Sequence, residues 1–235
     1  MVEIIEILEK AVEENRRFLT VYESKLVAQL AGLPVTRMGL AKCESEAVDI
    51  ARKIGFPVVL KIVSPDIVHK MDVGGVVLDL KNEEEVVKAY KSIIENVQEK
   101  VANARIEGVL VEEMLQPGVE VIVGGLRDRQ FGPIVAFGLG GIFVEIFKDL
   151  SYGIAPVDEH EALDMIKNTK AYKILSGYRG KGPYDIKAIT DLLVKTSRLI
   201  WAYRKYIAEI DLNPVFVYEK GLKIADARIG VELIR

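Results

Sequence analysis

The sequence is poor in cysteine and histidine: its 235 residues include one Cys and two His. The single cysteine, Cys43, excludes an intramolecular disulfide and a cysteine-based zinc site. A chain without disulfides is typical of a reducing compartment. We therefore expect the protein to be cytoplasmic.

Long hydrophobic runs are also missing. The longest uncharged stretch, residues 131–144, is interrupted by a proline and several glycines, and it is shorter than the roughly 20 apolar residues that span a bilayer. The N-terminal sequence MVEIIEILEK has the pattern of an acidic amphipathic helix, without the basic and then apolar regions of a signal peptide. The sequence thus predicts no membrane span and no export.

An excess of basic charge is absent as well. The net charge is −3, the isoelectric point is near 5.6, and lysines and arginines are scattered along the chain. This distribution argues against a nucleic-acid or polybasic membrane surface and favours small-molecule chemistry. Half of the residues are hydrophobic, so the chain can bury the core of one large domain or of two lobes.

The first half of the chain reads as a small α/β lobe over residues 20–105. Thr20 and Glu23 form a capping-box pattern, which predicts a helix from there to about Gly32. The periodicity then predicts strands at 35–40, 57–63 and 76–80 and helices at 45–54 and 83–101.

The second half, residues 106–235 with 1–19, is predicted to form a larger lobe. Strand candidates follow closely at 108–111, 119–123, 134–137 and 144–147, joined by turns that contain Gly or Pro, and this favours a largely antiparallel sheet. Helices at 159–167 and 186–203 and strands at 207–217 and 222–229 complete the pattern. We expect an α/β (α+β) fold of two lobes that meet at a cleft.

Lys61 stands alone among apolar residues in the strand 57–63, where burying an ammonium is costly without an anion partner. A phosphate is one such partner, and an edge strand that exposes Lys61 to solvent is the alternative. Downstream, Gly74 and Gly75 allow backbone N–H groups to approach an anion closely. Taken alone, the glycine pair is equally consistent with an ordinary turn.

Two further segments fit a nucleotide. Glu112, Glu113 and Met114 stand at the exit of the strand 108–111, where backbone groups and a polarisable Met suit an adenine ring. Glu120 begins the next strand, and its carboxylate can accept hydrogen bonds from ribose hydroxyls. An exposed acidic residue is the alternative for Glu120.

The C-terminal end reads as a hairpin. A turn centred between Glu219 and Lys220 sets Asn213 opposite Asp226. It also sets Asp211 opposite Arg228. Opposed residues on antiparallel strands are close enough to share one Mg²⁺ through oxygen ligands. A bulge at Gly221 would shift this register, and a simple surface ion pair is the other alternative.

The two histidines differ in context. His160 lies in an acidic helix start and reads as a solvated surface residue. His69 follows Ser64, Pro65 and Asp66 and precedes the glycine pair, so it is carried on a loop beside the candidate phosphate site. Neutral imidazole can attack phosphorus near neutral pH. A plain surface histidine is again the alternative.

Taken in order, these segments resemble an ATP-grasp domain over nearly the whole chain, and in particular the β subunit of ADP-forming acetyl-CoA (acyl-CoA) synthetases, which is related to succinyl-CoA synthetase. The segments that carry the resemblance are Lys61, residues 64–70 with His69, Gly74 and Gly75, residues 112–114, Glu120, residues 138–141, residues 211–214 and Asp226.

The resemblance implies ATP or ADP held between two largely antiparallel sheets. Lys61 would contact the phosphates, Gly74 and Gly75 would cover them, residues 112–114 would contact adenine, and Glu120 would contact the ribose. Asn213 and Asp226 would hold Mg²⁺. The implied catalytic residues are His69, Lys61 and Asp211.

The implied reaction is acyl-CoA + ADP + phosphate ⇌ acid + ATP + CoA. No glycine-rich segment of a CoA-binding domain is present, so a larger CoA-binding α subunit with its own phosphohistidine is expected, in an α2β2 assembly. We hypothesise that His69 receives the phosphoryl group from that subunit and delivers it to ADP. The alternatives are a stand-alone ATP-grasp carboxylate ligase that forms an acyl phosphate and a non-catalytic nucleotide-sensing subunit.

Overall fold

The structure is a computed structural model that describes residues 3–67, 69–141, 149–178, 180 and 182–232. Its contacts divide the chain into a larger unit, Met1–Val35 with Pro117–Arg235, and a smaller unit, Thr36–Gln116. The sequence had suggested boundaries near 20 and 105. Residues 20–35 instead group with the larger unit, because Ser24 and Lys25 hydrogen-bond to Ile229 and Ala225 there.

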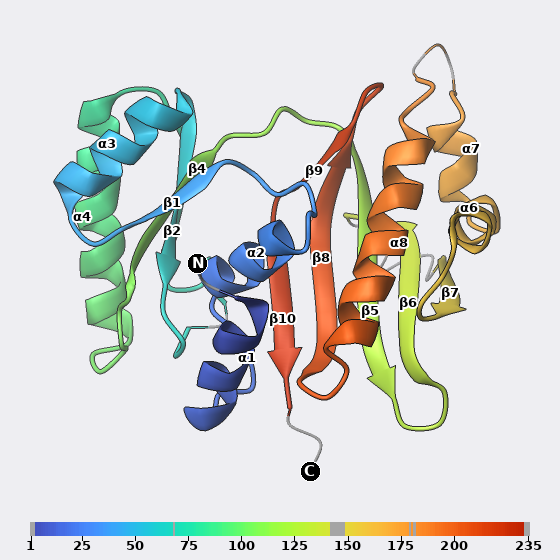
Figure 1. The fold of residues 1–235 in the computed structure, drawn as a ribbon. Helices are drawn as coiled ribbons and strands as arrows, with labels where there is room; N and C mark the ends of the chain where they lie inside the picture. Colours follow the sequence, from blue (N-terminus) through green and yellow to red (C-terminus); the bar gives the residue numbers. More distant parts are fainter. Residues whose placement is uncertain (1–2, 68, 142–148, 179, 181, 233–235) are drawn as a thin grey trace. The chain divides into compact units, whose positions relative to one another are not determined.

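The smaller unit is an antiparallel sheet with two helices on one face (Figure 1). The strand order is β1-β4-β2-β3. The elements are β1 (Met38–Ala41), α3 (Glu44–Ile54), β2 (Val58–Val63), β3 (Val76–Leu80), α4 (Glu83–Lys100) and β4 (Gly108–Glu113).

Side-chain alternation along β2 positions the first candidate site. Val58, Leu60 and Ile62 point to the helices and belong to the core of this unit. The intervening residues lie on the other face because successive side chains of a strand alternate. This places Lys61 on the face of the sheet that the helices do not cover.

The larger unit has a six-stranded antiparallel sheet in the order β10-β8-β5-β6-β7, with β9 also paired to β8. The strands are β5 (Val119–Asp128), β6 (Gly132–Leu139), β7 (Leu150–Ile154), β8 (Ile207–Val217), β9 (Leu222–Ile224) and β10 (Ala227–Val231).

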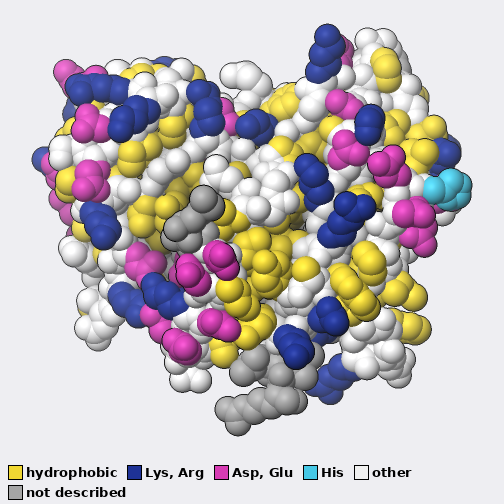
Figure 2. Space-filling view, in the orientation of Figure 1, with side chains coloured by type: hydrophobic (Ala, Val, Ile, Leu, Met, Phe, Trp, Pro, Cys, Tyr) yellow, Lys and Arg dark blue, Asp and Glu magenta, His cyan; other side chains and the backbone are white. Residues whose placement is uncertain are grey.

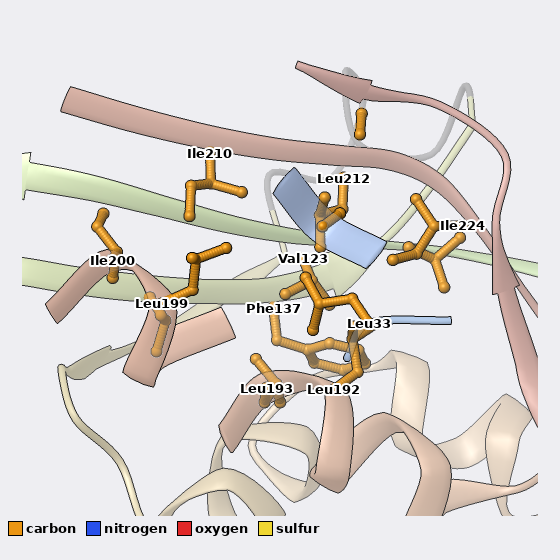
Figure 3. Packing of buried hydrophobic residues seen from close by; sticks show 14 of the residues in the cluster. Leu33, Val123, Phe137, Leu192, Leu193, Leu199, Ile200, Ile210, Leu212 and Ile224 are labelled. Atoms are coloured by element: carbon orange, nitrogen blue, oxygen red, sulfur yellow. The ribbon is translucent and has the colours of Figure 1, made fainter. Parts of the chain in front are cut away.

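Helices cover one face of this sheet: α1 (Ile4–Glu13), α2 (Val21–Leu30), α6 (Glu159–Lys167), α7 (Ala171–Leu175) and α8 (Ile186–Ala202). Figure 3 shows Leu192 and Leu193 of α8 beside Phe137 of β6 and Val123 of β5. All four side chains are essentially buried. The opposite face, which we call the open face, carries Glu120, Gly124, Leu126 and Asp211, and it positions the second candidate site.

Most predicted elements are confirmed, including the capping box at Thr20 and Glu23. Strand β7 and helix α7 were not predicted. The expected strand at 144–147 lies outside the described residues. The last predicted strand, 222–229, is interrupted in the structure between β9 and β10.

The surface carries side chains of both charges. Figure 2 shows basic and acidic side chains interspersed over the face in view. Of the helices that the structure describes, none is both long and apolar enough to cross a membrane.

Candidate functional site

Lys61 lies in the middle of β2, and its anion partner in the structure is a carboxylate of its own sheet. Nζ is 2.5 Å from Oε1 of Glu112 on β4, and the two side chains are 12% and 2% exposed. The other oxygen, Oε2, accepts a hydrogen bond of 2.7 Å from the Thr36 hydroxyl. Glu112 is therefore an anion partner of the buried ammonium, a role for which the sequence had suggested a phosphate.

Glu113 and Met114 end the same strand. Glu113 accepts two hydrogen bonds from Arg37, one from the backbone N–H and one from Nε, at 2.9 and 2.8 Å. The Glu113 and Met114 N–H groups donate to the carbonyls of Arg37 and Pro57. A contact of this segment with adenine thus remains a prediction, and it would have to use other groups than these two N–H donors.

The loop between β2 and β3 carries His69 and both glycines. It is anchored at one end by Asp66, which accepts from the Arg105 N–H at 2.7 Å. At the other end, the Gly75 carbonyl accepts from the Ile62 N–H at 2.7 Å. Between these anchors the side chain of His69 is exposed. The fold thus presents the imidazole on a loop that is fixed at both ends.

The glycines have a clear local role in this loop. Gly74 has a φ of 69°, which disfavours residues with a side chain. A Cβ on Gly75 would lie 2.5 Å from the Ile62 side chain. The two N–H groups donate to the carbonyls of Met71 and Lys70. The predicted contact of Gly74 and Gly75 with phosphates remains a prediction.

In the larger unit, Glu120 lies near the start of β5 beside the glycine segment 138–141. Its carbonyl accepts from the Gly140 N–H at 2.8 Å. A Cβ on Gly141 would be 3.0 Å from Oε2 of Glu120, so the segment lies close against the carboxylate. The proposed ribose contact of Glu120 remains a prediction.

The C-terminal hairpin has the register that the sequence predicted. Arg228 pairs with Asp211 across β10 and β8, and the Asn213 N–H donates to the Asp226 carbonyl at 3.2 Å. The pairs of β9 with β8 continue the same register, so Gly221 introduces no shift. Asn213 and Asp226 therefore oppose each other where β9 and β10 are interrupted.

The neighbouring acidic residue, Asp211, sits in a mixed environment. Burial raises the pKa of its carboxyl, the charge of Arg228 lowers it, and Asp226 and Glu209 raise it, with a net upward shift. Oδ2 of Asp211 is 3.7 Å from Nη2 of Arg228. The hairpin thus gathers two acids, an amide and a guanidinium on adjacent positions.

The donor set of this hairpin fits a hard cation only in part. Asn213 and Asp226 offer oxygen ligands, which Mg²⁺ prefers, and Oδ1 of Asp226 is buried. Among the described residues there is no group of three or more His, Cys, Asp and Glu that could hold a metal. The pair fits Mg²⁺ that arrives with nucleotide phosphates and water as its remaining ligands.

The predicted site residues are divided between the two units. Lys61, His69, Gly74, Gly75 and residues 112–114 belong to the smaller unit, and Glu120, Asp211, Asn213 and Asp226 belong to the larger one. Sequence reasoning missed Thr36, which gave no local signal because it meets Glu112 from 76 positions away. It noted Arg228 opposite Asp211 but gave Arg228 no role.

The comparisons with known proteins identify the family of the chain. A family model described as an ATP-grasp domain matches residues 10–231. The β subunit of acetate–CoA ligase [ADP-forming] I from Pyrococcus furiosus is 48% identical over 224 residues, which is 95% of this chain and 96% of that one.

Solved structures are similar to the chain as well. Acetyl-coenzyme A synthetase 1 of Ca. Korarchaeum cryptofilum, described as dinucleotide forming and in complex with coenzyme A, Ca-AMPCP and HgCl+, matches with a TM-score of 0.93 and 55% identity, covering 98% of this chain and all of that one. A second structure of that protein, with coenzyme A and Mg-AMPPCP and a phosphohistidine segment described as pointing towards the nucleotide binding site, matches with a TM-score of 0.86 and 51% identity over the same shares.

The chain therefore belongs to the ATP-grasp family, whose domain binds nucleotide, and this confirms the predicted fold. More particularly, it is a member of the β-subunit family of ADP-forming acetate–CoA ligases, so it is a subunit of a ligase.

Proposed function

We propose that this chain is the subunit of an ADP-forming acyl-CoA synthetase that moves a phosphoryl group between a phosphohistidine and ADP. The overall reaction is acyl-CoA + ADP + phosphate ⇌ acid + ATP + CoA. In the step assigned to this chain, the N–P bond of the phosphohistidine breaks and its electron pair stays on the imidazole nitrogen. A β-phosphate oxygen of ADP forms the new O–P bond.

The observation that carries this proposal is the opposed pair of Asn213 and Asp226 in a family whose domain binds nucleotide. Their oxygens are the donors that Mg²⁺ prefers, and a relative has been solved with Mg-AMPPCP. When bound, Mg²⁺ neutralises charge on the phosphate oxygens. Asn213 and Asp226 would be its protein ligands.

The remaining residues have distinct proposed roles. His69 is the nucleophile, because its imidazole is exposed on an anchored loop. Lys61 contributes positive charge for the phosphates, although Glu112 already pairs with it. Asp211 is the carboxylate that orients the imidazole during transfer. Gly74, Gly75, residues 112–114 and Glu120 contact the nucleotide as predicted from the sequence.

The partner is a larger CoA-binding α subunit with its own phosphohistidine. Support comes from the relative that is named a β subunit and whose length this chain matches almost completely. We further propose an α2β2 assembly, which the resemblance to the family implies. We also propose that the protein is cytoplasmic, because a chain with a single cysteine is typical of a reducing compartment.

Nucleotide binding to the purified chain tests the metal pair. Calorimetry should show Mg-ADP bound at least about tenfold more weakly by Asp226→Asn, since losing even a supporting residue of a metal site typically costs 10- to 100-fold in affinity. Glu219→Gln, in the exposed turn of the same hairpin, is the matched control and should bind like wild type. Chelating the metal should abolish the difference between Asp226→Asn and wild type.

Equal Mg-ADP affinity in all three proteins would contradict the role of Asp226. Acyl-phosphate formation without a larger subunit would instead favour a stand-alone carboxylate ligase. Tight Mg-nucleotide binding with full tolerance to loss of His69 would favour a nucleotide-sensing subunit.

A further inference from the structure

The open face of the larger unit has a pocket of about 240 Å³, and of its lining residues only Asp211 has a role above. Five of its lining residues form one row across five strands, because Arg228 pairs with Asp211, Asp211 with Gly124, Gly124 with Ala136, and Ala136 with Tyr152. Residues that are directly opposed in an antiparallel sheet point to the same face. The row is therefore a continuous trough on one surface of one unit.

The residues in the middle of the row have small side chains, and those at its two ends have long ones. Gly124 and Ala136 form the floor, and Tyr152 and Arg228 form the walls. A Cβ on Gly124 would meet no atom closer than 3.5 Å, whereas one on the next residue, Gly125, would lie 3.0 Å from the Ile200 side chain. Packing thus restricts Gly125 but not Gly124, and the missing side chain of Gly124 leaves room in the pocket.

Arg228 is held in place but loosely paired. Its guanidinium carbon is 5.2 Å from the centroid of the Phe18 ring, within range of a cation–π contact. Nη2 is 3.7 Å from both the Glu209 and the Asp211 carboxylates, beyond hydrogen-bond distance. The side chain is 47% exposed. Its N–H groups are therefore placed to donate to an anion that enters the pocket, and a planar guanidinium suits phosphoryl oxygens.

The opposite wall is apolar and aromatic. Tyr152 is 62% exposed, and Leu126, which also lines the pocket, is 47% exposed. An exposed aromatic ring offers a face for a flat ring such as imidazole. The pocket thus combines a ring-binding wall with an anion-binding wall.

The pocket also lies next to the candidate metal pair. Asn213 is two residues beyond Asp211 on β8, which corresponds to about 7 Å along a strand. A phosphoryl group bound at Arg228 would therefore lie close to a cation held by Asn213 and Asp226.

We propose that this pocket binds a phosphorylated imidazole during transfer, with Arg228 donating to the phosphoryl oxygens and Tyr152 contacting the ring. This rests on the proposed function. Arg228 stabilises the phosphoryl group while the bond to nitrogen breaks and the bond to the ADP oxygen forms. The imidazole can belong to His69 or to the larger subunit, and the experiment separates these sources.

The test uses the assembled enzyme, labelled beforehand from acyl-CoA and radioactive phosphate and then mixed with Mg-ADP under rapid quench. Arg228→Ala should slow label transfer to ADP by about 100-fold, and Arg228→Lys should recover part of the rate. Gly124→Val fills the floor and should also slow transfer. Arg129→Ala removes an exposed arginine of the β5–β6 turn and should transfer like wild type. Affinity for Mg-ADP should stay unchanged in all four variants.

Wild-type transfer rates in both Arg228→Ala and Gly124→Val would contradict the proposed role of the pocket. The two variants alter different parts of it, so the test does not depend on one substitution. Failure of the wild-type enzyme to label ADP would instead overturn the proposed function. In a His69→Ala background, transfer that still depends on Arg228 assigns the imidazole to the larger subunit. If His69→Ala abolishes transfer, and if label accumulates on His69 in the single variant Arg228→Ala, the imidazole in the pocket is that of His69.

Discussion

The two units of this chain place charge on their sheets in different ways. In the smaller unit, Lys61 and Glu112 form a close pair with side chains only 12% and 2% exposed. In the larger unit, Arg228 and Asp211 are separated by 3.7 Å with side chains 47% and 42% exposed. We call Lys61 and Glu112 the closed pair, because the two groups are close together and buried. We call Arg228 and Asp211 the open pair, because they are further apart and accessible to a ligand.

This difference indicates which of the two pairs should affect the stability of the fold and which should affect catalysis. Breaking a buried ion pair leaves an uncompensated charge in a low-dielectric interior, whereas a loose exposed pair contributes little to stability. Removing one partner of the closed pair should therefore lower the free energy of unfolding strongly. Substitutions at the open pair should change catalysis and leave the fold intact.

The largest expected effect is at the closed pair. Glu112→Ala should lower the free energy of unfolding by about 3–5 kcal/mol, because it leaves the Lys61 ammonium without this carboxylate. Urea denaturation measures the change. In the double variant Lys61→Met/Glu112→Leu both charges are removed, and much of the stability should return. No recovery in the double variant would contradict the electrostatic explanation.

The open pair should respond in the opposite way. Asp211→Asn should reduce turnover of the assembled enzyme by about 100-fold, as expected when a group that assists proton or phosphoryl chemistry is lost. The free energy of unfolding should change by less than about 1 kcal/mol, because the pair with Arg228 is long and exposed. Steady-state kinetics and urea denaturation together test this. A large loss of stability with normal turnover would reverse the comparison.

A second buried ion pair, Arg16 with Glu23, lies in the larger unit, and its contribution to the free energy of unfolding should depend on pH. Burial raises the pKa of Glu23, but hydrogen bonds from Arg16 and Thr20 outweigh it, and the net pKa is lowered. A lowered folded pKa contributes stability above the unfolded value of about 4.3, and this is lost as the pH falls through the folded pKa. Glu23→Gln should therefore cost about 1.5–3 kcal/mol at neutral pH and progressively less below about pH 4.

The matched control for Glu23 is Glu161, which occupies the same capping-box position in α6. Glu161→Gln removes the charge but keeps an oxygen that can accept from the Asp158 N–H, so it should cost less than about 1 kcal/mol. Thermal melts between pH 3 and pH 7 compare the two variants. A gap between wild type and Glu23→Gln that widens in acid would contradict the assigned pKa direction.

The smallest expected effect is at Glu113, next to Glu112 in sequence. Its partner Arg37 is 62% exposed, so Glu113→Ala should cost about 1 kcal/mol or less. The contrast with Glu112→Ala tests the burial of the basic partner, because both glutamates end the same strand while Lys61 is 12% and Arg37 is 62% exposed. Equal losses at the two positions would show that the strand end, not the buried charge, controls stability.

The sequence was most informative where the pattern is local. Turn position alone predicted the register of the hairpin, and this placed Asn213 opposite Asp226 as the structure has it. The capping box at Thr20 was read in the same way. Short-range geometry fixes both features, so no tertiary information was needed.

Features that depend on distant segments were not predicted. The partner of Lys61 is Glu112, and only the antiparallel pairing of β2 with β4 brings them together. Strand β7 is half-exposed along most of its length and has a weak apolar pattern, so it was missed. The row from Arg228 to Tyr152 crosses five strands and becomes visible only once the whole sheet is assembled.

Labelling of the assembled enzyme with γ-labelled ATP and Mg²⁺ tests the central claim, that His69 carries the phosphoryl group. We expect acid-labile, base-stable label on this chain in wild type and in His160→Ala, whose imidazole is 84% exposed beside Asp164. We expect none in His69→Ala, together with loss of turnover. Undiminished label on this chain in His69→Ala, or turnover near the wild-type rate, would contradict the account.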